Sequence, residues 1–497
     1  MLRLPRSARR APVLAMLRAM LLAGLLAALP LALLAGPAPA APSAAPSADL
    51  SADRAGPVAG SSGIGDPYFP LDGNGGIDVR RYRIHVGYDF DTGRLTGRAV
   101  LTVRATRALA RFNLDLLLPV EEVRVDGRPA SFRKPRRHEL QVSPARPIAA
   151  GSRFTVTVRY AGRPAGIAYA GERNWLADER EVVTMNQPHM APWWFPANDH
   201  PSDKAQVDVS VTVPRARRVV ANGELVGRRV HGALATTRWR SREPMAPYLA
   251  FFAAGPFQVD SGRTAGVSWY AAVSRQLPAR QRTRSMRLMR RSAPITAWAA
   301  SILGEYPFSS TGGLTTALQP GFALENQTRP TYPVLGADAV PTVVHEIAHQ
   351  WFGNSVAVDA WRDIWLNEGA ATFFELLWAE THGGPSAAQW LSSAYDVEPA
   401  ESTFWRLRID DPGAARIFDE AVYLRGAMTF QALRTRIGAA DFATLLRTWV
   451  ARGAGGTGST AQFTALAEQV SGEDLDGFFD AWLRTPARPA RTAANGL

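Results

Sequence analysis

The stretch PTVVHEIAHQWFGNSV, residues 341–356, contains two histidines four positions apart, with a glutamate directly after the first. On a helix, residues at this spacing lie one turn apart on the same face, so His345 and His349 can point the same way. Two imidazole nitrogens in that arrangement suit a tetrahedral metal ion such as zinc. Glu346 lies beside them and can act as general base toward a water on the metal. The competing interpretation is a helix with a solvated polar face.

A third candidate ligand favours the metal site. The stretch DIWLNEGAATFFELLWAE places Glu368 nineteen residues after His349, at the start of another predicted helix. Two histidines and one glutamate leave a fourth position open for water, which is typical of catalytic zinc. Glu375, two turns further along the same face, is either a partner for a ligand histidine or an exposed helix residue. The ligand types indicate one zinc ion, although cobalt or manganese could substitute.

The residues upstream of this motif have a different periodicity. The stretches RRYRIHVGYDF, RFTVTVRY and AQVDVSVTVP alternate apolar and polar residues, with turn residues between them. This period predicts a mostly antiparallel β domain over residues 66–259. Residues 260–485 contain helix-compatible stretches, of which RTRSMRLMRRSAPITAWAASILGEYPF is the longest. We therefore predict a multidomain α+β protein.

Composition restricts the chemistry further. The 497 residues include no cysteine, which excludes disulfides, thiolate metal sites and a cysteine nucleophile. The formal net charge is +12, but the arginines are spread along the chain without the dense runs that track phosphates. We expect no nucleic-acid partner.

Both ends of the chain differ in composition from the rest. Residues 1–40 combine a basic start, an apolar core and small residues near Ala40, which indicates a cleaved signal peptide and a secreted protein. The alternative is a membrane anchor, but the apolar run is short for a stable span. Residues 41–65 are rich in Ala, Pro, Ser and Gly and are predicted to be a flexible linker. Residues 486–497 are predicted to be a disordered tail.

The zinc motif and its surroundings resemble the aminopeptidase N family of zinc peptidases, which are thermolysin-like gluzincins. The stretch GFALENQ resembles the family's Gly-Ala-Met-Glu-Asn segment, with Ala323, Glu325 and Asn326 matching and Leu324 in place of Met. By this resemblance all three matching residues belong to the substrate-binding site, and Glu325 binds the free α-amino group of a peptide. A carboxylate there would pair with the ammonium and so measure off one residue.

Two further segments carry the resemblance. NQPHMAPWWFPANDHPSDKA matches at Phe195 and Lys204, with Ala197 in place of a Cys, and Gln187 stands where the family has a Glu or Gln that helps hold the amino terminus. AVYLRGAM resembles the family's Tyr-x-Lys-Gly-Ala segment, with Arg425 in place of Lys. Tyr423 is thereby implied to stabilise the oxyanion. The larger family members continue in a further helical domain that covers the site.

Together these features predict an exported, zinc-dependent aminopeptidase. The resemblance implies a thermolysin-like catalytic domain that begins with a small sheet around GLTTAL, residues 313–318. Peptides with a free N-terminus are the expected partners, and no stable membrane anchor is expected after signal cleavage. One alternative is a zinc endopeptidase with an open cleft, which would cleave N-blocked and free substrates equally. A peptide-binding protein with a structural metal is the non-enzymatic alternative, which the presence of Glu346 and Tyr423 disfavours.

Overall fold

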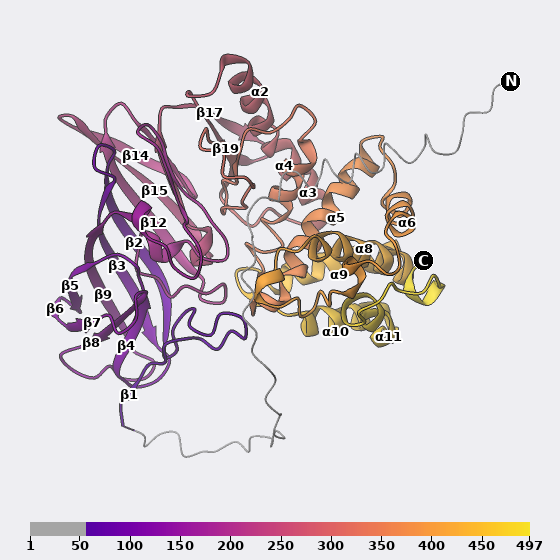
Figure 1. Cartoon of the computed structure of the whole chain (residues 1–497), viewed down its shortest axis with the longest axis horizontal. Helices are drawn as coiled ribbons and strands as arrows, with labels where there is room; N and C mark the ends of the chain where they lie inside the picture. Colours follow the sequence, from indigo (N-terminus) through magenta and orange to yellow (C-terminus); the bar gives the residue numbers. More distant parts are fainter. Residues whose placement is uncertain (1–55) are drawn as a thin grey trace.

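The computed structural model describes residues 56–497. Figure 1 shows a β-rich region formed by the first half of these residues beside a mostly helical region formed by the second half. This arrangement confirms the predicted α+β architecture and the order of its two parts. The predicted signal peptide, residues 1–40, and the first part of the predicted linker lie outside the described residues.

The largest sheet of the β-rich region has eight strands with alternating buried and exposed residues. In β2 (Ile77–Asp89), for example, Tyr82, Ile84 and Val86 are buried while their neighbours are exposed or half-buried. All neighbouring strands are antiparallel except β2 and β12, which are parallel. In spatial order the strands are β14 (Glu224–His231), β15 (Leu234–Met245), β12 (Ala205–Pro214), β2, β3 (Arg94–Ala105), β9 (Arg153–Gly162), β5 (Val120–Val125) and β6 (Arg128–Pro129).

Two four-stranded sheets complete this region. The first has the order β1 (Val58–Ala59), β4 (Leu109–Asp115), β8 (Glu139–Ser143) and β7 (Ser131–Arg133). The second has the order β10 (Trp175–Ala177), β11 (Val182–Thr184), β16 (Phe252–Gly255) and β13 (Arg218–Ala221).

The predicted linker requires a correction at its C-terminal end. Strand β1 pairs in parallel with β4, and the Gly60 N–H donates to the Arg111 carbonyl at 2.9 Å. A Cβ atom on Gly60 would lie 2.7 Å from the Gly75 carbonyl oxygen, so the close approach needs a glycine. This segment has few large apolar side chains, so its composition resembles that of a linker. Backbone hydrogen bonds hold it in place instead.

The helical region begins with a small sheet. Its order is β17 (Phe257–Thr264), β18 (Val267–Ser274), β19 (Ser310–Thr315) and β20 (Thr331–Tyr332). Residues 313–315 of the GLTTAL stretch form the end of β19, as the family resemblance implied. The predicted domain boundary at residue 259 falls inside β17, so the second region starts a few residues earlier than its change of periodicity indicated.

Helices follow this sheet. The long stretch predicted as helical from residue 282 forms two helices, α2 (Ala279–Arg290) and α3 (Ser292–Leu303), which meet at Arg291. The remaining α-helices are α4 (Val340–Ala348), α5 (Trp365–Thr381), α6 (Ala387–Val397), α7 (Thr403–Arg406), α8 (Glu420–Ile437), α9 (Ala439–Arg452), α10 (Thr460–Ser471) and α11 (Asp476–Phe479). A short parallel pair, β21 (Ala357–Val358) and β22 (Thr457–Gly458), joins two of their connections.

Short helical turns lie between the main elements. The 3₁₀ turns are η3 (Pro164–Gly166), η4 (Ala191–Trp193), η5 (Pro247–Leu249), η6 (Trp361–Asp363), η7 (Ala414–Arg416) and η9 (Ala493–Asn495), and η8 (Asp480–Arg484) is a π-helical turn. Within residues 56–497 no helix has the length and hydropathy that crossing a bilayer requires.

The predicted disordered tail is wrong for residues 486–497. The Tyr395 hydroxyl donates to the Pro489 carbonyl at 2.7 Å, and the Trp482 indole N–H donates to the Asn495 carbonyl at 3.0 Å. Gly496 lies against Ala432 of α8, at a distance that leaves no room for a Cβ atom. Aromatic side chains from earlier helices therefore anchor a segment that has little apolar surface of its own.

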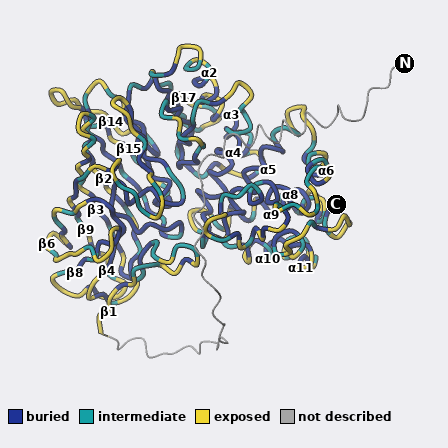
Figure 2. Tube along the Cα trace, in the orientation of Figure 1, coloured by how far each residue is buried: buried dark blue, intermediate teal, exposed yellow. Residues whose placement is uncertain are grey.

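One continuous core runs through both regions, and Figure 2 shows buried chain in the centre of each. Polar contacts also join the regions. The Lys204 ammonium donates to the carbonyls of Asn354, Ser355 and Gly456 at 2.6–3.1 Å. The segment that carries the family-like FPANDHPSDKA residues is thus fixed directly against the loop that follows α4.

Candidate active site

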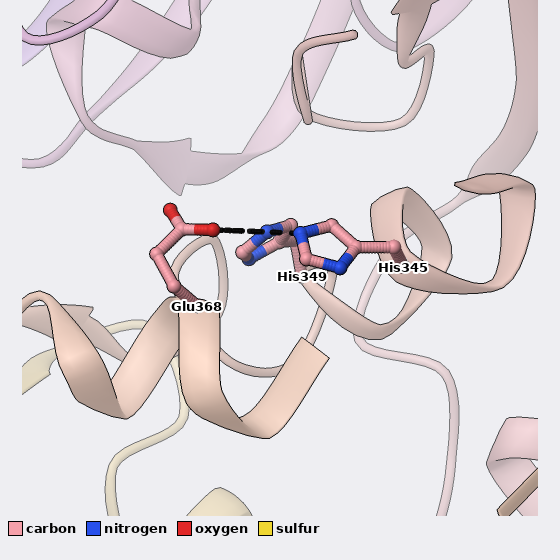
Figure 3. A group of neighbouring side chains, drawn as sticks. All are labelled: His345, His349 and Glu368. Atoms are coloured by element: carbon pink, nitrogen blue, oxygen red, sulfur yellow. Dashed lines mark ion pairs between the residues drawn. The ribbon is translucent and has the colours of Figure 1, made fainter. Parts of the chain in front are cut away.

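His345 in α4 and His349, directly after its last residue, lie one turn apart on the same side. Their ring centroids are 4.7 Å apart, and both Nε2 atoms face Glu368 in the first turn of α5 (Figure 3). Glu368 Oε2 lies 3.4 Å from each Nε2 atom. The structure therefore brings together the three residues that the sequence predicted as metal ligands.

The outer nitrogen of each histidine is already engaged. His345 Nδ1 lies 2.8 Å from Glu375 Oε1, and His349 Nδ1 lies 3.1 Å from the Phe352 carbonyl oxygen. Metal-binding histidines usually have such a partner, which orients the ring and leaves the other nitrogen for the metal. Glu375 was predicted to be either a partner of a ligand histidine or an exposed helix residue. The structure shows the contact with His345.

The spacing of the three inward atoms fits a metal ion. All three lie within 4.8 Å of one another, and two ligands of a tetrahedral zinc ion are about 3.4 Å apart. Burial alone would raise the pKa of Glu368, but the two facing histidines lower it to about 2. This carboxylate is therefore held in the ionised form that binds a metal.

Glu346 directly follows His345 on α4 and is 5% exposed. Burial raises its pKa to about 8, against the opposing effect of the two neighbouring histidines. Glu325, Glu346 and His349 each place one polar atom within 4.8 Å of the others. The candidate general base and the candidate amine-binding residue therefore both lie beside the metal ligands.

Glu325 is held from two sides. Its Oε1 atom accepts a hydrogen bond from Gln187 Nε2 at 3.1 Å and one from the Tyr248 hydroxyl at 2.9 Å. Its backbone carbonyl accepts from Gln350 Nε2 at 3.2 Å and Asn354 Nδ2 at 2.7 Å. The carboxylate is fixed toward the site by residues of both regions, since Gln187 and Tyr248 belong to the β-rich region.

Tyr248 was not identified from the sequence. It is 2% exposed and lies 77 residues before its partner Glu325, in the stretch APYLAFF. A tyrosine within an apolar stretch is typical of a core residue, so no local pattern distinguishes it. Its hydroxyl at the carboxylate becomes evident only from the fold.

Asn326 and Ala323 flank Glu325 in different ways. The Asn326 side chain is fully buried, and its Nδ2 donates to the Leu249 carbonyl at 3.1 Å. Ala323 is half-buried and packs against the core. The geometry gives Asn326 a contact that braces the Glu325 loop, and the predicted substrate contacts of both residues remain predictions.

Tyr423 lies in the first turn of α8, opposite the histidines. Its ring stacks on that of His345, with a centroid distance of 6.1 Å and an interplanar angle of 20°. Helices α5 and α8 cross closely because two glycines meet there: a Cβ atom on Gly369 would lie 2.8 Å from Gly426 Cα. This close crossing brings Glu368 and Tyr423 to the same site.

Arg425, which stands where the resembling family has Lys, points away from the site. Its guanidinium is fully buried and lies 5.7 Å above the Trp405 ring. It donates to the carbonyls of Trp405, Leu407, Ala481 and Thr485. The planar fork satisfies several loop carbonyls at once, so this residue fixes the chain around α8.

Comparison with known families gives two matches along the chain. The model of the Peptidase M1 N-terminal domain matches residues 80–249, and that of the Peptidase family M1 domain matches residues 313–482. The first match lies within the β-rich region, and the second contains the candidate metal ligands, Glu325 and Tyr423.

Several curated proteins that are similar to this chain are named as aminopeptidases. Aminopeptidase N of Lactococcus lactis is 26% identical over 451 residues, which cover 83% of this chain and 51% of the relative. Human glutamyl aminopeptidase is 27% identical over 375 residues, which cover 69% of this chain and 38% of the relative. Rice aminopeptidase M1-D is 25% identical, with 65% and 38% covered. The chain thus spans about two fifths of the length of several of these relatives.

Solved structures match over their full length. An M1 zinc metallopeptidase from Deinococcus radiodurans superposes with a TM-score of 0.75 at 28% identity, covering 86% of this chain and 98% of that one. A mutant of that enzyme bound to a Tyr-Ser-Ala substrate matches with the same score and covers 100% of that chain.

Proposed function

Because this chain belongs to the M1 family of peptidases, we propose that it is a zinc-dependent aminopeptidase that removes the N-terminal residue from peptides. The family implies zinc, and its members include the aminopeptidases that resemble this chain. The observation that carries the proposal is the position of Glu325, within 4.8 Å of both Glu346 and His349 by their polar atoms.

This distance matters because of the geometry of an amino acid. The α-nitrogen and the carbonyl carbon of one residue are both bonded to Cα and lie about 2.5 Å apart. A carboxylate that pairs with the free ammonium must therefore lie immediately beside the group that acts on the carbonyl. Glu325 satisfies this condition, and Gln187 and Tyr248 hold it there.

His345, His349 and Glu368 would hold one zinc ion. When bound, zinc would act as a Lewis acid and lower the pKa of a water molecule toward neutrality. Glu346 accepts the proton of the attacking water and delivers it to the nitrogen of the leaving amine. The Tyr423 hydroxyl donates a hydrogen bond to the oxyanion that develops on the substrate carbonyl.

The test compares an alanyl or leucyl anilide that has a free amine with the same compound N-acetylated. We expect cleavage of the free-amine compound alone, and its loss on addition of a zinc chelator. Equal cleavage of both compounds would contradict the proposal and favour an endopeptidase. Failure to cleave either compound, across anilides of several residue types, would contradict both the aminopeptidase and the endopeptidase hypothesis.

A variant isolates the contribution of the amine-binding carboxylate. In Glu325→Gln the carboxylate becomes an amide of the same size, so the hydrogen bonds to the ammonium lose their charge assistance. We expect kcat/KM for the free-amine substrate to fall about 10- to 100-fold. The control is Glu305→Gln, since Glu305 is exposed and only its backbone carbonyl makes a contact, to Trp351.

We also propose that the protein is exported, on the basis of the basic start and apolar core of residues 1–40. Expression of the full chain, followed by fractionation and mass measurement, tests this. Export predicts a product outside the cytoplasm that has lost about 40 residues. A full-length product retained in the cytoplasm would contradict it.

A further inference from the structure

Two buried carboxylates face each other in the β-rich region. In the sequence they are distant from the residues of the candidate active site. Asp115 ends β4 and Glu139 begins β8, and the two are directly paired across the antiparallel ladder. Each is 1% exposed. Like charges at directly opposed positions repel, and burial makes each charge more costly. The pair therefore requires either a compensating cation or a proton.

A histidine next to the pair is oriented toward it. His138 is 4% exposed, and its Nδ1 atom lies 2.8 Å from the Tyr169 hydroxyl oxygen. Its Nε2 atom lies 3.6 Å from Glu139 Oε2. Asp115, His138 and Glu139 each offer one ligand atom, and these three atoms lie within 4.8 Å of one another.

The atoms that converge here have no hydrogen-bond partners among residues 56–497. These atoms are Asp115 Oδ1, both carboxylate oxygens of Glu139, and His138 Nε2, for which the Leu71 backbone carbonyl lies near the ring without forming a well-aligned hydrogen bond. By contrast, Asp115 Oδ2 accepts from Asn74 Nδ2 at 3.0 Å and from the Asp199 N–H at 2.9 Å. Donors thus satisfy the outward side of Asp115 and leave its inward side free.

Within the described part of the chain, His138 is the only basic side chain in ion-pair contact with either carboxylate, and Arg136 only partly offsets the rise that burial causes in the pKa of Glu139. Arg136 is exposed, and the Lys134 ammonium donates instead to the carbonyls of Leu116 and Leu118. Asp199 adds a third buried carboxylate nearby, with an unpartnered Oδ2 atom. The surroundings are therefore strongly favourable for a cation.

We propose that Asp115, His138 and Glu139 form a second metal site that binds a divalent transition-metal ion such as Zn²⁺. One imidazole nitrogen with carboxylate oxygens selects this class of ion over Ca²⁺ and Mg²⁺, which prefer oxygen ligands alone. The histidine has the same arrangement as those of the candidate active site, with Nδ1 engaged and Nε2 turned inward. This inference does not rest on the proposed function.

The role of this site would be structural. The backbone of Asp115 exchanges two hydrogen bonds with Ala197, at 2.8 and 3.0 Å, so β4 is directly joined to the FPANDHPSDKA segment. The Lys204 end of that segment is fixed to the loop after α4. A cation on Asp115 and Glu139 would brace β4, β8 and this segment at one point.

The experiment measures the metal content of the purified full chain by mass spectrometry of the elements, after equilibration with Zn²⁺ and desalting. We expect two zinc ions per chain in the wild type and one in Glu139→Gln. Glu368→Gln should also hold one, and the double variant none. Glu179→Gln, at an exposed position in the same region, is the matched control and should hold two.

Thermal unfolding provides a second readout that separates a metal from a shared proton. With a metal bound, Glu139→Gln lowers the Tm, and added Zn²⁺ no longer raises it to the wild-type value. Without a metal, the substitution removes a buried repulsion, so the Tm stays equal or rises. A zinc content that is the same in the wild type and in Glu139→Gln, with an unchanged or higher Tm, would overturn the proposal.

Discussion

Two buried clusters in this protein are built from the same kinds of side chain on different backbones. In the helical region, His345, His349 and Glu368 converge, with Glu368 Oε2 3.4 Å from the Nε2 atom of each histidine. In the β-rich region, Asp115, His138 and Glu139 converge from β4 and β8. In both, the Nδ1 atom of each histidine has a partner and Nε2 faces a carboxylate.

The difference lies in what surrounds each cluster. Glu325, Glu346 and Tyr423 reach the helical cluster, and each carries a polar group suited to a bound substrate. Around the strand cluster, the backbone of Asp115 is occupied by the β ladder and Ala197. We therefore expect a site of this donor type to become catalytic through its neighbours, because metal ligands alone supply no group that accepts and donates a proton.

The largest expected effect tests this difference directly. Glu346→Gln removes a neighbour of the helical cluster but none of its three ligands. We expect kcat to fall about 10³-fold, because the attacking water loses its general base, while the zinc content stays unchanged. Peptidase assays combined with metal analysis check both parts. Full activity in this variant would show that the neighbour is not what distinguishes the two clusters.

A pair of substitutions compares the histidine partners of the two clusters. Glu375→Gln weakens the contact with His345 Nδ1, and Tyr169→Phe removes the contact with His138 Nδ1. Loss of such a partner typically reduces metal affinity 10- to 100-fold. We expect each variant to weaken zinc binding at its own cluster only, as measured by competition with a chelator of known affinity.

Each variant of this pair is the control for the other. Glu375→Gln should reduce activity at low zinc concentration, and Tyr169→Phe should leave it unchanged. If Tyr169→Phe changes the zinc affinity of neither cluster, His138 does not bind a metal. The similarity of the two clusters is then only apparent.

These clusters also differ in how visible they are in the sequence. Helical spacing places His345 and His349 on one face, and a helix start provides Glu368, so the convergence of these three candidate ligands was predictable. Asp115 and Glu139 meet only through the register of two strands that are 24 residues apart. No local pattern specifies that register, and a lone histidine before an apolar strand is typical of many surface turns.

The two segments that were wrongly predicted to be flexible have the same physical cause: their contacts are with residues distant in the sequence. Residues 58–60 and 489–496 are held by backbone hydrogen bonds and by aromatic partners distant in the chain. Their own composition has few apolar residues, and composition alone predicts a flexible segment. Elements with strong periodicity, such as β2 and β12, were predicted correctly because their own side chains determine which face is buried.

A third buried carboxylate shows what donors do to such a group. The Asp66 side chain accepts hydrogen bonds from the N–H groups of Tyr68, Phe69 and Trp361 and contacts His200 Nε2 at 3.2 Å. Burial alone would raise its pKa, but these donors lower it to about 2, from 3.8. For Glu139, whose carboxylate oxygens accept no hydrogen bond among the described residues, burial raises the pKa.

Since the folded-state pKa of Asp66 is depressed, its stabilising contribution is present above pH 3.8 and is lost as the pH falls toward about 2. The contribution is about 2 kcal/mol. We expect Asp66→Asn to lower the free energy of unfolding by that amount at pH 7, and by progressively less as the pH decreases to 3. Urea unfolding at several pH values measures this.

The matched control for Asp66 is Asp396→Asn, which removes an exposed ion pair with Arg491. It should change the free energy of unfolding little at any of these pH values, because exposed pairs contribute weakly. A loss of stability in Asp66→Asn that is the same at pH 7 and pH 3 would contradict the role of its ionised form.

The smallest expected effect concerns a group that touches no metal ligand. Tyr248→Phe removes the hydroxyl that donates to Glu325 Oε1 and leaves the Gln187 contact in place. One hydrogen bond of this kind contributes about 1 kcal/mol, so we expect KM for free-amine substrates to rise about fivefold with kcat nearly unchanged. Tyr306→Phe is the control, because it also loses one buried hydroxyl contact, to the Ser310 carbonyl, away from the site. If both variants change KM equally, the effect comes from general destabilisation and not from the orientation of Glu325. A rise confined to Tyr248→Phe would show that even the outer neighbours of the helical cluster contribute to substrate binding.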